Sequence, residues 1–181
     1  MSKIAVNKLY NANVYVNGIS FLGRAEEVTL PKVQSKMVEH KALGMVGVIE
    51  TPAGIEKMEA KIKWSSLYPE VLGEAANPYK AVSIQVRASL ETYDSTGRIV
   101  ELPVVAFMTA QFKNFPGIAY KHQDNAEVET DLAVSYYKLQ IVGKDYIEVD
   151  VFANIWKVEG EDILAMYKTN IGVNYEKLTS L

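Results

Sequence analysis

The chain has 181 residues, of which 49% are hydrophobic and 23% are charged, with a formal net charge of −3. This composition is typical of one globular domain that is large enough to bury a core, and it lacks the basic footprint expected of proteins that hold nucleic acid. The absence of cysteine excludes disulfides, thiolate metal sites and cysteine nucleophiles. Neither a signal peptide nor a transmembrane helix is expected, because no apolar stretch is long enough.

Alternation of apolar and polar residues predicts strands through the N-terminal third of the chain. A strand region is expected over residues 13–30, with a break at Asn17-Gly18. A strand over 33–43 follows, and we expect it to pair with a strand over 55–64 across the loop between them.

The segment between those two strands, at about 42–56, is unusually apolar and rich in glycine. Its core is Gly44, Met45, Val46, Gly47, Val48 and Ile49. Two interpretations remain open at this point. The segment is either a loop folded over the protein's own core or an extended hairpin arm that completes a neighbouring copy, because a two-stranded ribbon needs something to pack on.

One helix is expected, at about 66–76. Ser65 or Ser66 is a candidate cap, and Pro69 suits a first helical turn. An apolar stripe at helical spacing supports this expectation, and it consists of Leu67, Val71, Leu72 and Ala75.

Five more strands are expected in the rest of the chain, over 81–91, 98–112, 127–142, 146–158 and 163–169. The clearest alternation is in 81–91, and Asp94 to Gly97 supplies the turn that follows it. A bulge is expected at Tyr136-Tyr137, and turns are expected at 143–145 and 159–162. The predicted fold is therefore mainly β, an antiparallel sandwich or barrel with one flanking helix and a hairpin arm, in a single domain over 1–181.

No catalytic, cofactor-binding or metal-binding residues are expected. The only histidines, His40 and His122, lie far apart among polar residues, and we interpret both as surface residues. Phosphate-binding glycine loops and nucleophile elbows are absent from the sequence. The lysines Lys57, Lys61 and Lys63 alternate with glutamates, which favours a solvated strand face. An enzyme is therefore not expected.

Several segments together resemble the major tail tube protein of contractile-tailed phages, the P2-like tube family. They are 11–33, the Gly-Met-Val-Gly run at 44–47, the strand through 58–64, Tyr136-Tyr137-Lys138-Leu139, Tyr146-Ile147-Glu148-Val149-Asp150 and Asn170-Ile171-Gly172. The resemblance covers 10–172. R-type tailocin tubes are similar.

The resemblance implies that six copies form a ring with a continuous inner β-barrel, and that rings stack into a tube. The arm would contact a neighbouring copy or the next ring. The candidate interface residues are Gly44, Met45, Val46, Gly47, Val48, Ile49, Asn170, Ile171 and Gly172. The resemblance leaves residues 173–181 as a C-terminal extension beyond the usual ending.

The partners implied by the resemblance are other copies, a tail sheath protein, and tape-measure and baseplate or initiator proteins. DNA would pass through the lumen without being held, which suits an acidic protein. The protein would be made in the bacterial host cytoplasm and would end in a virion tail or tailocin particle. Two alternatives remain open: a type VI secretion tube protein with the same fold, and a small β-barrel that binds an apolar ligand.

Overall fold

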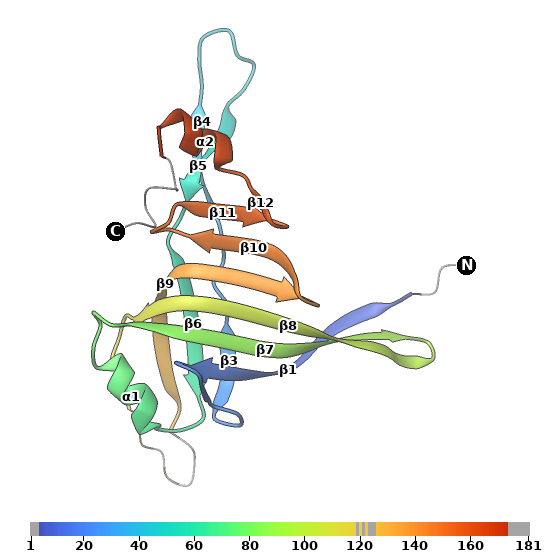
Figure 1. Cartoon of the computed structure of the whole chain (residues 1–181), viewed down its shortest axis with the longest axis vertical. Helices are drawn as coiled ribbons and strands as arrows, with labels where there is room; N and C mark the ends of the chain where they lie inside the picture. The colour runs from blue at the N-terminus through green and yellow to red at the C-terminus, as the bar shows by residue number, and fades with distance from the viewer. Residues whose placement is uncertain (1–3, 119, 121, 123–125, 174–181) are drawn as a thin grey trace.

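Antiparallel strands dominate the computed structural model, which describes residues 4–118, 120, 122 and 126–173 (Figure 1). The elements in chain order are β1 (Val6–Val16), β2 (Ile19–Ser20), β3 (Ala25–Thr29), β4 (Ser35–His40), β5 (Ile49–Ile55), β6 (Met58–Trp64), α1 (Pro69–Ala75), β7 (Ala81–Asp94), β8 (Gly97–Phe112), β9 (Val128–Ile141), β10 (Lys144–Asp150), β11 (Ile155–Val158), β12 (Glu161–Asp162) and α2 (Ala165–Asn170). The prediction of a mainly β, antiparallel fold is confirmed.

The strands form one large sheet and one separate hairpin. The large sheet has the order β12-β11-β10-β9-β8-β7-β1-β2, and β6 joins it through β9, with β3 on the far side of β6. β4 and β5 pair only with each other among the described residues. The β7–β8 hairpin is the longest element, and Asp94 opens its turn by accepting the Thr96 amide at 2.7 Å.

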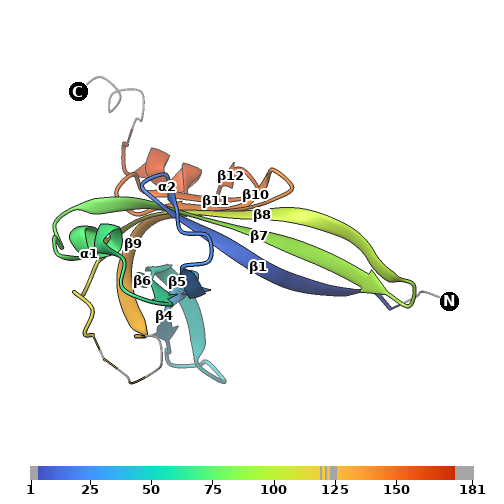
Figure 2. The same ribbon diagram turned by 90° about the horizontal axis from the view of Figure 1, so that it is seen from below.

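Strand β9 changes partner halfway along its length. Its first half pairs with β6 up to Met58↔Val134, and its second half pairs with β10 from Tyr136 onwards. Ser135 lies between the halves, where the pairing with β8 skips one residue. A bulge bends a strand and increases its twist, and β9 accordingly curves from the long sheet towards β6 (Figure 2). The predicted bulge at Tyr136-Tyr137 is therefore one residue too late.

The core lies between the curved sheet and the β3–β6 pair. Alternate residues of β6, β7, β8 and β9 are buried there, as period-2 patterns require. Among the largest fully buried side chains are Trp64, Phe21, Phe112, Ile62, Ile84, Met108 and Leu132. The rings of Phe21 and Trp64 meet edge to face with centroids 5.2 Å apart. The Trp64 indole donates to the buried Thr130 hydroxyl at 3.0 Å, which pairs these two polar groups inside the core.

Helix α1 is shorter than predicted and has a different start. Tyr68 occupies the N-cap position without a side-chain cap, and Pro69 begins the helix. Ser65, a predicted cap, instead donates to the Arg24 carbonyl at 3.0 Å and shares a hydrogen bond with the Tyr68 hydroxyl. The cap prediction is wrong because the Ser65 hydroxyl bonds to the Arg24 carbonyl and does not accept a hydrogen bond from an amide of the first helical turn.

The predicted pairing at the base of the arm is also wrong. β4 pairs with β5, from Ser35↔Ile55 to His40↔Ile49, and not with the strand over 55–64. Pro52 lies within β5, which is possible because a two-stranded ribbon has free outer edges that tolerate proline. The arm therefore begins at Ser35, before the predicted 42–56.

The predicted strand over 146–158 is a hairpin, and the predicted strand over 163–169 is mostly helix. Asp150 accepts the Ala153 amide at 3.0 Å and Asn154 has φ of +52°, which together turn the chain between β10 and β11. Asp162 accepts the Leu164 amide at 2.9 Å and the buried Lys168 ammonium at 2.5 Å, which fixes the start of α2. Apart from its first residue, the predicted C-terminal extension lies outside the described residues.

Candidate assembly surfaces

The first candidate surface is the arm, defined as β4, β5 and the tip residues 41–48 between them. It projects away from the large sheet (Figure 1, Figure 2). Every described residue of the arm between Lys36 and Gly54 is exposed. Two-stranded ribbons are marginal in water, so an arm that packs on nothing in its own chain is suited to contact another.

The predicted interface residues of the arm lie together at its tip. Leu43 and Val46 are fully exposed, and Met45, Val48 and Ile49 are exposed to lesser degrees. The turn is closed by the Met45 amide, which donates to the Ala42 carbonyl at 3.3 Å. The tip is thus an apolar knob without a charged side chain from Ala42 to Ile49.

The other predicted interface residues, Asn170, Ile171 and Gly172, are not at the tip. They end helix α2, where the Ile171 amide donates to the Tyr167 carbonyl at 3.1 Å and Gly172 has φ of +74°. This is a helix C-terminus closed by a left-handed glycine. The arm tip and this group therefore form two separate patches.

A second candidate surface, which sequence reasoning missed, is a tongue made of residues 6–10, 89–94 and 97–103. It extends β1, β7 and β8 well beyond the core (Figure 2). Pairing between β8 and β9 starts only at Val104, and the Val142 amide donates to the Pro103 carbonyl at 2.9 Å, so within the described residues 97–102 leave one backbone edge open. Residues 6–10 of β1 leave the opposite edge open. The exposed apolar residues of the tongue are Val6, Leu9, Tyr10, Ile99 and Val100.

A buried carboxylate holds the tongue together. Glu91 is almost completely buried, and it accepts the Tyr93 hydroxyl at 2.6 Å and the Arg98 guanidinium at 2.9 Å. The Tyr93 hydrogen bond, and then Arg98, lower the pKa of Glu91 despite its burial. These charge-assisted bonds keep the strands in register where the hydrophobic core does not reach. Unusual strand length was the only signal for the tongue in the sequence.

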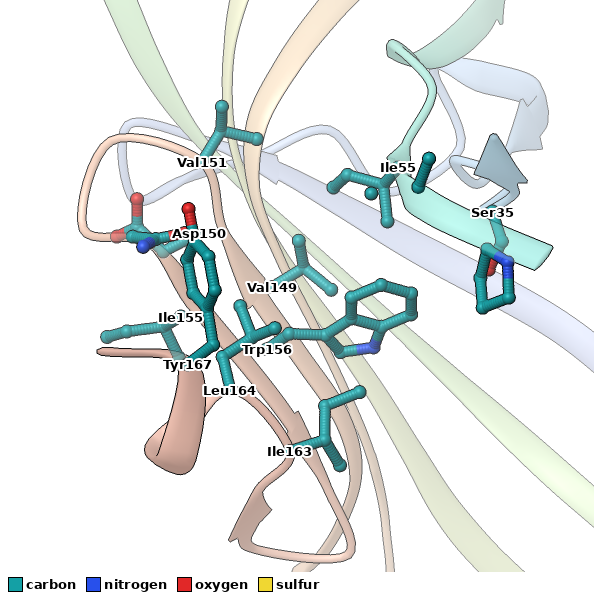
Figure 3. A pocket seen from close by; sticks show the side chains of 14 residues that line it. Ser35, Ile55, Val149, Asp150, Val151, Ile155, Trp156, Ile163, Leu164 and Tyr167 are labelled. Atoms are coloured by element: carbon teal, nitrogen blue, oxygen red, sulfur yellow. The ribbon is translucent and has the colours of Figure 1, made fainter. Parts of the chain in front are cut away.

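A cavity of about 710 Å³ lies at the base of the arm (Figure 3). Ser35 and residues 52–55 form one side of it. The other side comes from β10, β11 and the segment leading into α2. Trp156 lines the cavity, and its Nε1 is buried without an acceptor among the described residues. No sequence pattern predicted this cavity, because separate segments of the chain build it.

The outer face of β6 is a solvated strand face, as predicted from its alternating charges, and the structure adds a ladder of ion pairs along it. Hydrogen bonds from the Lys113 and Lys57 ammonium groups lower the pKa of Glu59 to about 2. His40 and His122 are exposed, which confirms their interpretation as surface residues. The ion pairs join Lys61 to Glu129 at 3.0 Å, Lys63 to Glu127 at 3.3 Å and Lys113 to Glu59 at 2.5 Å.

Known proteins resemble this chain along most of its length. Residues 6–172 match the family described as phage tail tube protein FII. The chain belongs to this family. The tail tube protein of Escherichia phage P2 is 32% identical over 170 residues, which cover 92% of this chain and 97% of that protein. The major tail tube protein of Serratia phage KSP20 is 24% identical, over 86% of this chain and 90% of the other.

The fold is also similar to that of a chain in the sheath-tube complex of PVC, an extracellular contractile injection system, in its extended state. The TM-score is 0.54 at 13% identity, over 72% of this chain and 88% of that chain. The predicted family and fold are thereby confirmed. Among the described residues, no helix is long and apolar enough to cross a membrane, and no acidic or histidine cluster is arranged to hold a metal ion.

Proposed function

We propose that this chain is the tube subunit of a contractile tail, and that six copies associate into a ring whose stacking builds the tube. The observation that carries this proposal is membership, over residues 6–172, of a family of tail tube proteins. The function is structural rather than catalytic, as it is for the named relatives. The number of six copies follows from the resemblance to P2-like tubes.

The open edges of the tongue support assembly through strand pairing. Residues 97–102 expose one edge of the sheet and residues 6–10 expose the other. Edges of this kind pair with other chains unless they are covered. If β8 of one copy pairs with β1 of the next, the sheet continues around the ring and its edges disappear, as in closed barrels.

The proposed partners follow from the position of a tube within a tail. A sheath protein surrounds the tube, and tape-measure and baseplate or initiator proteins set its length and start. DNA passes through the lumen, and a subunit with a net charge of −3 releases passing phosphates instead of holding them. The subunit is made in the host cytoplasm and ends in the virion tail or a tailocin particle.

Electron microscopy of purified protein tests the proposal. We expect rings or tubes, alone or when seeded with tail-initiation proteins, and a protein that stays monomeric under both conditions would contradict it. Changing Met45 and Val46 to Asp should give folded protein that does not polymerise, because the apolar knob becomes charged. Tyr79→Asp changes an exposed side chain outside the arm, the tongue and α2 and should leave assembly intact.

A further inference from the structure

We propose that the cavity at the base of the arm is the acceptor site for the arm tip of a second copy of this chain. The inference rests on the proposed function, because it names the two surfaces through which tube subunits meet. Within one chain, the tip is an apolar knob that packs on nothing described, and the cavity is an apolar hole (Figure 3).

The cavity is suited to an apolar occupant. Its walls include Val149, Ile155, Trp156 and Ile163, and its volume of about 710 Å³ is ample for several aliphatic side chains. Asp150 is the single charged residue among those that line it, and its carboxylate accepts the Ala153 amide. A free ionic ligand would therefore find little to pair with in the wall.

The arm tip complements this hole because both are apolar. No residue from Ala42 to Ile49 is charged, and Leu43 and Val46 are fully exposed. Removing such side chains from water favours association.

The tip cannot fill the cavity of its own chain. Paired strands separate the two, from Ser35↔Ile55 in the cavity wall to His40↔Ile49 beside the tip. Five residue steps along a strand span about 17 Å. A knob and a hole at different places on one chain give a heterologous contact, which propagates into rings or filaments, as a tube requires.

The Trp156 indole supplies a specific anchor for the incoming arm. Its N–H is buried without an acceptor among the described residues, and a buried unpaired donor is costly. Gly44 and Gly47 have no side chains to cover the main-chain carbonyls of the tip. Because this nitrogen has no exposed surface in the single chain, docking of the second copy would have to shift the wall around the indole before a tip carbonyl could accept its hydrogen.

Cysteine crosslinking tests the inference directly, because the chain contains no cysteine of its own. The test variant combines Val46→Cys at the tip with Tyr167→Cys in the cavity wall. The matched control combines Val46→Cys with Met166→Cys, since Met166 adjoins Tyr167 on α2 but does not line the cavity. The two residues are 52% and 72% exposed, so neither change should unfold the protein.

After oxidation of assembled particles, we expect the Tyr167 pair to give a ladder of covalent oligomers on a non-reducing gel. The Met166 pair should give at least tenfold less crosslinked product, because a disulfide needs its two Cβ atoms within about 4.5 Å. The pair Val46→Cys with Ile163→Cys provides a second position in the wall. Val46→Cys mixed with Tyr167→Cys on separate chains should stop at dimers.

Each other outcome overturns the inference. Suppose that particles are visible by electron microscopy but that neither the Tyr167→Cys pair nor the Ile163→Cys pair gives covalent oligomers. The tip would then bind elsewhere, and the proposed function would still hold. Failure to form particles under any condition would remove both. Rapid maleimide labelling of Tyr167→Cys is expected in unassembled protein, and protection there would show a small molecule or another segment of the same chain in the cavity.

Discussion

Strands β5 and β6 are neighbours in the chain and have seven residues each, but their surroundings are opposite. Strand β6 pairs with β3 on one side and β9 on the other, and it buries Met58, Ala60, Ile62 and Trp64. Strand β5 pairs only with β4 within the described residues and buries none. Stability is therefore concentrated in β6, and β5 is left available for contacts between copies.

The polar side chains of β5 and β6 also differ in how far they are shielded from water. Ion pairs connect the solvent-exposed face of β6 to neighbouring strands, and the Trp64–Thr130 hydrogen bond does so on its buried face. On β5, the Thr51 hydroxyl donates to the Val38 carbonyl at 3.4 Å in an exposed position. Solvent competes for the hydrogen bond of Thr51 and not for that of Thr130, so equal substitutions should have unequal effects.

The largest effect is expected from an isoleucine-to-alanine change made in each strand. Ile62 is fully buried, so Ile62→Ala removes core volume and should lower the free energy of unfolding by about 2–5 kcal/mol. Ile49 is exposed, so Ile49→Ala should change the stability of the unassembled chain by less than about 0.5 kcal/mol. Urea unfolding of the monomer measures both.

Equal losses of unfolding free energy for the two variants would contradict this contrast, because they would mean that the arm is stabilised by contacts within its own chain. In assembly we expect the opposite order of effects. Ile49→Ala should raise the protein concentration needed to form tubes, and this is measurable by sedimentation.

A smaller effect is expected from threonine-to-valine changes. Thr130→Val keeps the side-chain shape but leaves the buried Trp64 indole without its acceptor, which should cost about 1–3 kcal/mol. Thr51→Val alters an exposed hydroxyl of β5 and should have almost no effect. Thermal unfolding of the two variants, side by side, gives the difference, and a Thr51→Val loss as large as that of Thr130→Val would refute the expectation.

Strand positions, faces and the partners across tight turns could be predicted from the sequence, whereas the partners of strands that no tight turn joins could not. The alternation in 81–91 identifies the buried Val82, Ile84 and Val86 because side-chain direction has a period of two. The same pattern contains no information on which strand lies beside which. Val38 was therefore assigned to the wrong neighbour, although its strand was predicted.

The candidate site was predictable only where it consists of one continuous segment. The arm tip is such a segment, and its glycines and uncharged apolar residues mark it in the sequence. The cavity is not, because Ile55, Val149 and Trp156 come together only through the pairing of distant strands. Tyr167 was misread as a strand residue because Ile163, Ala165 and Tyr167 alternate by chance in a segment that Asp162 starts as a helix.

The smallest effect is expected from the wet face of β6, through the exposed carboxylate of Glu59. The Lys113 and Lys57 ammonium groups, which hydrogen-bond to it, lower its pKa from 4.5 to about 2. A carboxyl whose pKa is depressed by folding stabilises the folded state above its unfolded pKa, and it loses that contribution as the pH falls from about 4.5 through about 2. NMR titration of the Glu59 carboxyl carbon measures this pKa.

Lys113→Ala removes the hydrogen bond with the largest influence, so the pKa of Glu59 should rise towards 4.5. Stability at neutral pH should hardly change, because exposed ion pairs contribute little, and high salt should weaken the shift in the parent protein. A Glu59 pKa unaffected by Lys113→Ala would mean that Lys57 alone sets it. A large loss of stability instead would show that the wet face of β6, and not only its buried face, distinguishes this strand from β5.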